Sequence, residues 1–236
     1  MVTQATPTAS TAQLDHLVVV AHSLEQGVLW CESVLGITPG PGGEHALFGT
    51  HNRLFKIANA QNPTAYFEII AINTIAAYAS NTGAKRWFDM DDMALQQVVK
   101  IQPRLVHFVA SVPNASAACS ALKALGIERG NVILASRPTP QGLLEWQMTV
   151  REDGQRLFNG ALPTLIEWGD IHPTHTMPSS GITLHSLVVS HPEASLLQAA
   201  YQGIGLHSVN VSHGAVNLCA TLQTPKGLVR LESFGL

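Results

Sequence analysis

One pattern recurs three times along the 236 residues and restricts the fold more than any other feature of the sequence. Each copy opens with a short β-branched run typical of a strand. It continues with apolar residues at helical spacing and ends with three further strand-like runs. The opening runs are residues 14–21, 105–111 and 182–190. The first two helices end at the same tripeptide, Leu-Gly-Ile, where glycine supplies the left-handed residue that closes a helix. The pattern predicts an α+β protein built from three β-α-β-β-β modules.

The repeats divide the chain into modules and connections. Residues 74–103 are more charged than their surroundings and are expected to form an excursion or a surface helix. Residues 171–181 carry His172, His175 and two prolines, a composition typical of a linker. We therefore expect a disordered tail at 1–13, module 1 at 14–73, the excursion at 74–103, module 2 at 104–170, the linker at 171–181 and module 3 at 182–236.

Composition argues against several classes of partner. Hydrophobic residues make up 46% of the chain and charged residues only 12%, which favours a compact protein over a disordered one. The net charge is −3 and no basic stripe is present, so neither nucleic acid nor a membrane is expected as a partner. The three cysteines are isolated and fit neither a disulfide framework nor a zinc-thiolate site. We expect a cytoplasmic protein.

Histidines and glutamates occupy matching places in the three repeats. The opening strands each carry one histidine and the closing strands each carry one glutamate: His16, His107 and His185, and Glu68, Glu167 and Glu232. Each glutamate has apolar neighbours, where an ionised carboxylate is unfavourable unless a partner compensates it. The partner is either a metal ion, for which histidine is a common ligand, or the histidine itself through a hydrogen bond. For His185 and Glu232 a structural role is favoured, since a third module has no fourth to pair with unless a homodimer supplies one.

Residues 42–53 (GGEHALFGTHNR) form the loop most typical of a binding site. Its paired glycines permit close approach of a ligand to the backbone. We expect His45 to point inward as a third ligand or as an acid/base, with Asn52 as a further polar contact. Arg53 is a candidate clamp for a substrate carboxylate, and Arg137 is a candidate on the opposite side. Trp146 is expected to wall the pocket, although core packing explains it equally well.

These segments resemble the vicinal oxygen chelate superfamily, which includes the glyoxalase, bleomycin-resistance and extradiol dioxygenase folds. The matching stretches are LDHLVVVAHSLEQGVLWCESVLGI, GGEHALFGTHNRLFKI, YFEIIAIN, SRPTPQGLLEWQM and LPTLIEWG. The resemblance implies that modules 1 and 2 pair into a cup-like curved mixed sheet around a divalent metal ion. Carried over by position, it nominates as ligands His16, Glu68, His107 and Glu167. The ion it implies is zinc, nickel, manganese or iron(II).

The resemblance also implies a reaction. A metal-dependent lyase or isomerase would act on a small oxygen-rich organic molecule, with the ion polarising vicinal oxygens. A carboxylate that leaves the metal, Glu68 or Glu167, would then abstract a proton next to a carbonyl group, with His45 as a further acid/base. Two alternatives stay open. One is an extradiol-type dioxygenase, and the other is a non-catalytic, drug-type binding protein of the same fold.

Overall fold

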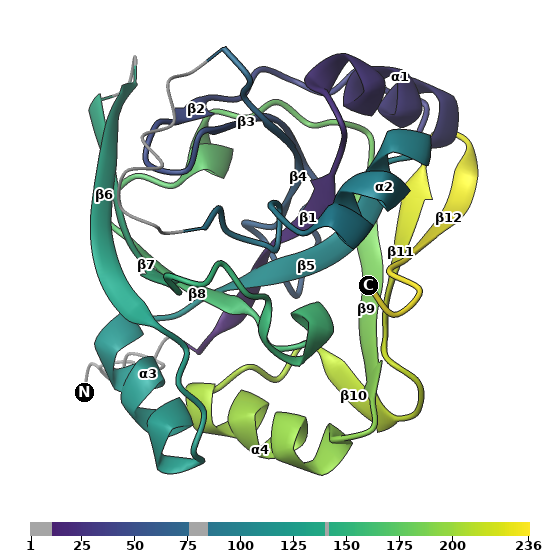
Figure 1. The fold of residues 1–236 in the computed structure, drawn as a ribbon. Helices are drawn as coiled ribbons and strands as arrows, with labels where there is room; N and C mark the ends of the chain where they lie inside the picture. Colours follow the sequence, from purple (N-terminus) through teal and green to yellow (C-terminus); the bar gives the residue numbers. More distant parts are fainter. Residues whose placement is uncertain (1–10, 76–84, 140–141) are drawn as a thin grey trace, which may run out of the picture.

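The computed structural model describes residues 11–75, 85–139 and 142–236, which form two β-sheets and surrounding helices (Figure 1). Eight strands make a curved sheet in the order β2-β3-β4-β1-β5-β8-β7-β6, and four make a second sheet in the order β10-β9-β11-β12. Residues 1–10 of the predicted tail and 76–84 of the predicted excursion lie outside the described residues. None of the helices in the described part of the chain has both the length and the apolar character needed to cross a membrane. The predicted α+β class is confirmed.

The first module supplies one half of the large sheet. Its elements are β1 (Gln13–Val20), α1 (Leu24–Val34), β2 (Glu44–His45), β3 (Thr50–Lys56) and β4 (Tyr66–Ile72). Ser23 begins α1 because its hydroxyl accepts a hydrogen bond from the backbone N–H of Gln26, a donor that has no partner within the first turn. The last strand, β4, lies parallel to β1 and antiparallel to β3. The first and last strands of the module are therefore neighbours.

The second module repeats this arrangement. Its elements are β5 (Arg104–Ser111), α3 (Ala115–Ala124), β6 (Asn131–Thr139), β7 (Gly142–Val150), the short 3-10 helix η2 (Leu157–Gly160) and β8 (Thr164–Trp168). β8 lies parallel to β5 and antiparallel to β7, as β4 does to β1 and β3. β1 and β5 pair antiparallel at the middle of the sheet, so an approximate two-fold axis relates the modules. The predicted cup of paired modules is confirmed.

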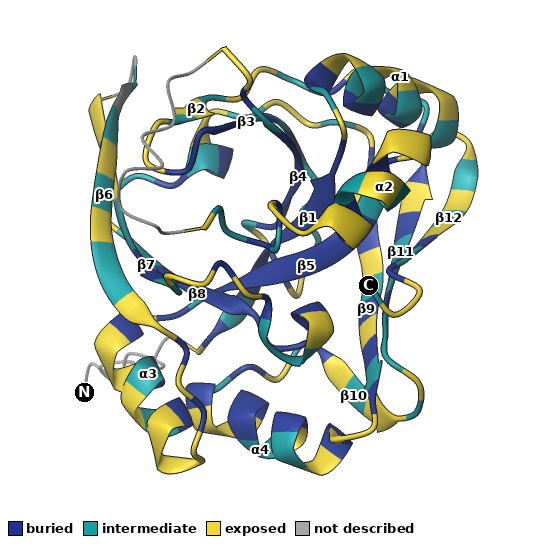
Figure 2. Ribbon diagram, viewed as in Figure 1, coloured by how far each residue is buried: buried dark blue, intermediate teal, exposed yellow. Residues whose placement is uncertain are grey.

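The two faces of the large sheet are covered differently. Successive strand residues point to opposite faces, so Leu17 packs outward among helices and the second sheet, while Val18 points into the cup. α2 (Met93–Ile101) lies in the stretch predicted as an excursion or surface helix, and it buries Leu95 and Val99 against the inward residues. Figure 2 shows the result, with β1 and β5 buried along their length beneath α2. The inner face is thus partly filled by the connection between the modules.

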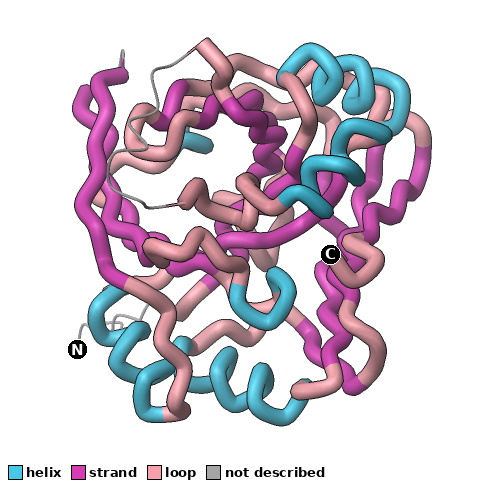
Figure 3. The backbone as a smooth tube through the Cα atoms, viewed as in Figure 1, coloured by secondary structure: helices cyan, strands magenta, loops and turns pink. Residues whose placement is uncertain are grey.

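The third unit repeats the element order of the modules but not their strand order. It consists of β9 (Thr183–His191), α4 (Ala194–Ile204), β10 (Asn210–His213), β11 (Asn217–Thr224) and β12 (Gly227–Glu232). Its first strand lies between β10 and β11, whereas the first strand of each module pairs with the last one. The unit packs on the outer face of the large sheet, with α4 beside α3 (Figures 1 and 3). His185 is exposed there and Glu232 pairs with Arg230, so these two residues do not meet.

The predicted linker runs along the large sheet rather than away from it. A short 3-10 helix, η3 (Pro173–His175), begins at His172, whose ring accepts a hydrogen bond from the backbone N–H of Thr174. Lys56 on β3 donates to the carbonyl oxygen of Thr174 at 3.4 Å, and the hydroxyl of Ser180 donates to the carbonyl oxygen of Lys56. The predicted linker is therefore held against β3 at Thr174 and at Ser180.

Candidate active site

Three polar side chains meet on the inner face of the first module. His16 on β1, Asn52 on β3 and Glu68 on β4 all point into the cup, and each is at most 6% exposed. Nε2 of His16 lies 3.6 Å from Oε2 of Glu68. Nδ2 of Asn52 donates to the other carboxylate oxygen, Oε1, at 2.6 Å. The backbone N–H of Gly43 donates to Oδ1 of Asn52 and so orients the amide with its N–H groups toward Glu68. One carboxylate oxygen is thereby held, and the other faces the histidine.

A buried carboxylate stands behind His16. Asp15 is fully buried, and its Oδ1 accepts a hydrogen bond from Nδ1 of His16 at 2.6 Å. Its Oδ2 accepts from Nε1 of Trp168 at 2.8 Å and lies 3.2 Å from Nε2 of His172. Burial by itself raises the pKa of Asp15, but the hydrogen bonds from His16 and His172 outweigh it and lower the pKa to about 2. Because ionised Asp15 holds a proton on Nδ1 of His16, Nε2 is the ring nitrogen directed into the cup.

His45 reaches the same group through Asn52. Its Nδ1 lies 3.0 Å from the hydroxyl of Thr50, and its Nε2 lies 3.3 Å from Nδ2 of Asn52. Burial lowers the pKa of His45 to about 4, although the nearby charge of Glu68 opposes the shift. The ring is therefore neutral near pH 7. His45 thus points into the cup, where its neutral ring is a hydrogen-bond partner of the Asn52 amide.

The second module places different chemistry at the matching positions. The register pairs His16 with Val109 and Val18 with His107 across the two-fold axis, so His107 is the counterpart of His16. Val18 pairs with Glu68 on β4, and Val109 pairs with Thr164 on β8. Thr164, not Glu167, is therefore the counterpart of Glu68.

Both ring nitrogens of His107 are engaged. Nε2 accepts from the backbone N–H of Thr164 at 3.1 Å, and Nδ1 lies 3.0 Å from the carbonyl oxygen of Gly160. The guanidinium of Arg129 also donates to the hydroxyl of Thr164. Burial, followed by the charges of Arg129 and Arg156, lowers the pKa of His107 well below its ordinary value. In the second module, the counterparts of His16 and Glu68 therefore bind each other and their neighbours within the buried core.

Glu167 lies on the other face of the sheet. It is adjacent to inward-facing Ile166 and Trp168, so the alternation along β8 turns it outward. Its Oε2 accepts a hydrogen bond from the backbone N–H of Ala115 at 2.8 Å, at the start of α3. A carboxylate in this place stabilises the helix N-terminus. The structure thus brings His16 and Glu68 together and leaves His107 and Glu167 elsewhere.

Three of the four predicted substrate-binding residues line the cup, and the fourth, Arg53, does not. Asn52, Arg137 and Trp146 line the inner cavity of the cup, which measures about 60 Å³. The guanidinium of Arg137 lies against the backbone of Gly43, where a Cβ would come within 1.8 Å of Nη1. Arg53 alternates with the inward residues of β3 and lines neither this cavity nor its larger neighbour.

Several residues of the site were not predicted from the sequence. Asp15 supports His16, and Tyr66 stacks on the His16 ring with centroids 4.4 Å apart. Trp87 meets the His45 ring edge-on at 4.9 Å and, with Phe88, lines the inner cavity. A signal existed for two of them, since Trp87-Phe88 is an apolar aromatic pair within an otherwise charged stretch. That signal shows neither that Trp87 packs on His45 nor that the pair points into the cup.

The described residues offer few ligands for a metal ion. Among residues 11–75, 85–139 and 142–236, no three or more histidine, cysteine, aspartate or glutamate side chains are grouped so that they could hold an ion. The centre of the cup offers two ligand atoms, Nε2 of His16 and Oε2 of Glu68. Asp15 binds Nδ1 of the same histidine, as carboxylates often do with histidines that ligate a metal. Catalytic zinc sites generally use three protein ligands. The described residues therefore do not fit a site of that kind.

A cup closed by two paired modules, with histidine and glutamate facing each other on neighbouring strands, defines a protein of the vicinal oxygen chelate fold. The chain belongs to the glyoxalase-like domain family, whose model matches residues 14–205. A hypothetical protein from Staphylococcus aureus has a similar solved structure, with 16% identity, a TM-score of 0.56 and coverage of 94% of this chain and 86% of that one.

Two methylmalonyl-CoA epimerase structures are more distantly similar. The enzyme from Mycobacterium tuberculosis is 15% identical with a TM-score of 0.37, over 70% of this chain and 91% of that one. A variant from Streptomyces coelicolor, in complex with 2-nitronate-propionyl-CoA, is 13% identical with a TM-score of 0.42, over 69% and 99%. No curated protein matches the chain.

The buried, neutral His107 predicts an acid-sensitive fold. Its ordinary pKa is 6.5 and its folded pKa is well below that, so as pH falls the unfolded chain takes up the proton first. Stability is fully present above pH 6.5 and should decrease below it by about 1.4 kcal/mol per pH unit for each such histidine. Urea unfolding between pH 7 and 5 measures this slope. His107→Asn should lower this slope by the share of one proton, while His45 keeps its own share. An unchanged slope in His107→Asn would contradict the assignment.

Proposed function

We propose that the protein is an enzyme that moves a proton on a carbon next to a carbonyl group of a small oxygen-rich acid. This is the chemistry of a lyase or an isomerase. One observation carries the proposal: Asp15 directs Nε2 of His16 at Oε2 of Glu68, 3.6 Å away, inside a buried cup. A histidine oriented by a carboxylate and paired with a second carboxylate is an arrangement suited to taking up and returning protons.

Each group has a distinct task in this reaction. Oε2 of Glu68 takes the proton from the substrate carbon, while Asn52 holds Oε1 and so fixes the carboxylate. The electron pair left on carbon is delocalised onto the carbonyl oxygen as an enolate. Nε2 of His16 faces Oε2 at 3.6 Å, so the pair must approach by about 0.5 Å to reach hydrogen-bond distance. His16 then takes over the proton from Glu68 and returns it to a neighbouring atom of the substrate. Arg137 lines the same cavity and supplies the positive charge that binds a carboxylate.

The predicted metal ion has a limited place in this reaction. Zinc, nickel, manganese or iron(II) would have only Nε2 of His16 and Oε2 of Glu68 as protein ligands, because no described group of three exists. No step is therefore assigned to it. A ring-cleaving dioxygenase is less well supported for the same reason, since non-haem iron of that type is held by two histidines and one carboxylate.

Proton exchange tests the proposal without knowledge of the product. The protein is incubated in D₂O with α-hydroxy ketones, hemithioacetals and 2- and 3-oxo acids, and loss of the C–H signal is followed by NMR. At least one compound should exchange about 10²-fold or more above the protein-free rate. Exchange should persist with EDTA, and mass spectrometry should find less than one transition ion per chain. Binding of panel compounds without any exchange would instead favour the drug-type binding protein.

A further inference from the structure

We infer that the substrate carries an apolar tail on its acidic head, and that the tail lies in a second cavity at the mouth of the cup. This inference rests on the proposed function, because it concerns the same site. The second cavity, called the rim cavity below, measures about 510 Å³, within the range of small-molecule sites and far above the 60 Å³ of the inner one. A small hydrophilic substrate would leave it unused.

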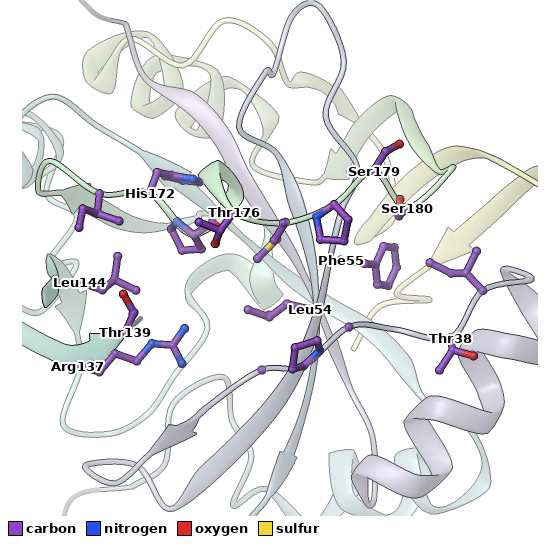
Figure 4. A pocket seen from close by; sticks show the side chains of 18 residues that line it. Thr38, Leu54, Phe55, Arg137, Thr139, Leu144, His172, Thr176, Ser179 and Ser180 are labelled. Atoms are coloured by element: carbon purple, nitrogen blue, oxygen red, sulfur yellow. The ribbon is translucent and has the colours of Figure 1, made fainter. Parts of the chain in front are cut away.

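Many of the side chains that line the rim cavity are apolar, among them Leu54, Phe55 and Leu144 (Figure 4). Its apolar residues come from the loop after α1, from β3, from β7 and from the predicted linker: Ile37, Pro41, Leu54, Phe55, Leu144, Ile171, Pro173, Met177 and Pro178. Figure 4 shows Arg137 and Leu144 at one side and Phe55 with Ser180 at the other, with Leu54 between them. A ligand held at Arg137 can therefore extend across Leu54 toward Phe55.

The rim cavity and the inner cavity meet at shared walls. Leu54, Arg137, Leu144 and Pro173 line both. The guanidinium therefore stands at the junction, between the acid/base groups on one side and the apolar chamber on the other. A molecule whose carboxylate lies at this junction would present its reactive carbon to Glu68 and its tail to the rim cavity.

Arg137 is the cation that such a carboxylate would pair with. In the described residues Arg86, Arg151, Arg156 and Arg230 each form an ion pair with an acidic side chain. No ion pair or hydrogen bond joins Arg137 to another described group, although it is half-buried between two cavities. A partly desolvated guanidinium gains most from a bidentate anion, so the charge favours a carboxylate head over a neutral one.

The wall of the rim cavity is connected to the catalytic histidine. Residues 171–180 form that wall, and His172 within them shares Asp15 with His16. The same segment is held to β3 by Lys56 and Ser180. A tail that packs against this segment therefore contacts the structure that orients His16.

Binding of straight-chain acids tests the inference separately from turnover. Isothermal titration calorimetry with butanoate, hexanoate and octanoate should show Kd falling roughly fourfold for each added methylene, the value expected for full burial of a CH₂ group. Octan-1-ol, which lacks the carboxylate, should bind at least about tenfold more weakly than octanoate, as a lost charge-assisted hydrogen bond implies. Arg137→Gln should remove the difference between octanoate and octan-1-ol.

A substitution that fills the cavity supplies the matched control. Thr176→Trp, at an exposed position of the rim, should abolish the dependence on chain length and leave butanoate binding intact, while Thr183→Trp on the second sheet should change neither. Equal affinity for all three acids in the unaltered protein would overturn the inference. Chain-length dependence without proton exchange for any compound would support the rim cavity and overturn the proposed function.

Discussion

Replacing Glu68 with glutamine is expected to lower kcat for proton exchange by about 10²–10⁴-fold, the usual contribution of a general base. Glutamine keeps the size of the side chain and the acceptor for Asn52, but it cannot take up a proton at the atom that faces His16. Because the amide still fits the buried site, KM should change much less than kcat. Rates measured by NMR on the best substrate of the panel would separate the two parameters.

Glu167→Gln is the matched control, since the same chemical change is made on the opposite face of the sheet. It should leave kcat essentially unchanged. It should lower stability by about 0.3–1 kcal/mol, because a charge at the start of α3 is lost. If the two substitutions impaired exchange equally, the register that places Thr164 opposite Val109 would not describe the active protein, and Glu167 would have to reach the cup.

Replacing Asp15 with alanine is expected to lower the free energy of unfolding by about 3–5 kcal/mol, the range for breaking one side of a buried charged pair. The carboxylate is fully buried and serves His16, Trp168 and His172. All three donors would be left without their acceptor. Urea unfolding at pH 7 measures the loss.

Asp153→Ala controls for the loss of an acidic residue. Asp153 pairs with Arg151 at the surface, where its side chain is 41% exposed, so its removal should cost about 0–1 kcal/mol. Similar losses in the two variants would mean that the three contacts of Asp15 contribute little to folding. In that case the carboxylate would act mainly by orienting His16, and the Asp15 variant would show its effect in kcat alone.

The fold was predictable because its signals are local. A β-branched strand, a helix closed by glycine and three further strands can be recognised without knowing what each packs against. The pairing of the first two modules was implied by the family resemblance that these segments carry. The register of one strand on another is not local. The prediction aligned the modules by residue type and so matched Glu167 with Glu68, whereas the pairing of β5 with β8 makes Thr164 the counterpart. A shift of three residues also reverses the face of the sheet.

Long-range contacts account for the rest of the difference. Trp87 from the charged excursion packs on His45, and His172 from the predicted linker binds Asp15, 157 positions away. Neither contact leaves a periodic trace in the sequence. The third unit shows the same limit. Its element order repeats, but its strand order changes, and that change is visible in the pairing of β9 with β10 and β11.

The second module offers no free acid/base group at the position that matches His16, because His107 is hydrogen-bonded through both ring nitrogens. This asymmetry has a stereochemical consequence. His16 and Glu68 both belong to the first module, and the facing wall of the inner cavity is built from apolar side chains, among them Trp146, Met148 and Ile166. A planar enolate lying between these walls would be accessible to acid/base groups from one side only. Under the proposed reaction, the proton would leave and return on the same face of the molecule. Such an enzyme would transfer hydrogen suprafacially between neighbouring atoms and would not invert a stereocentre.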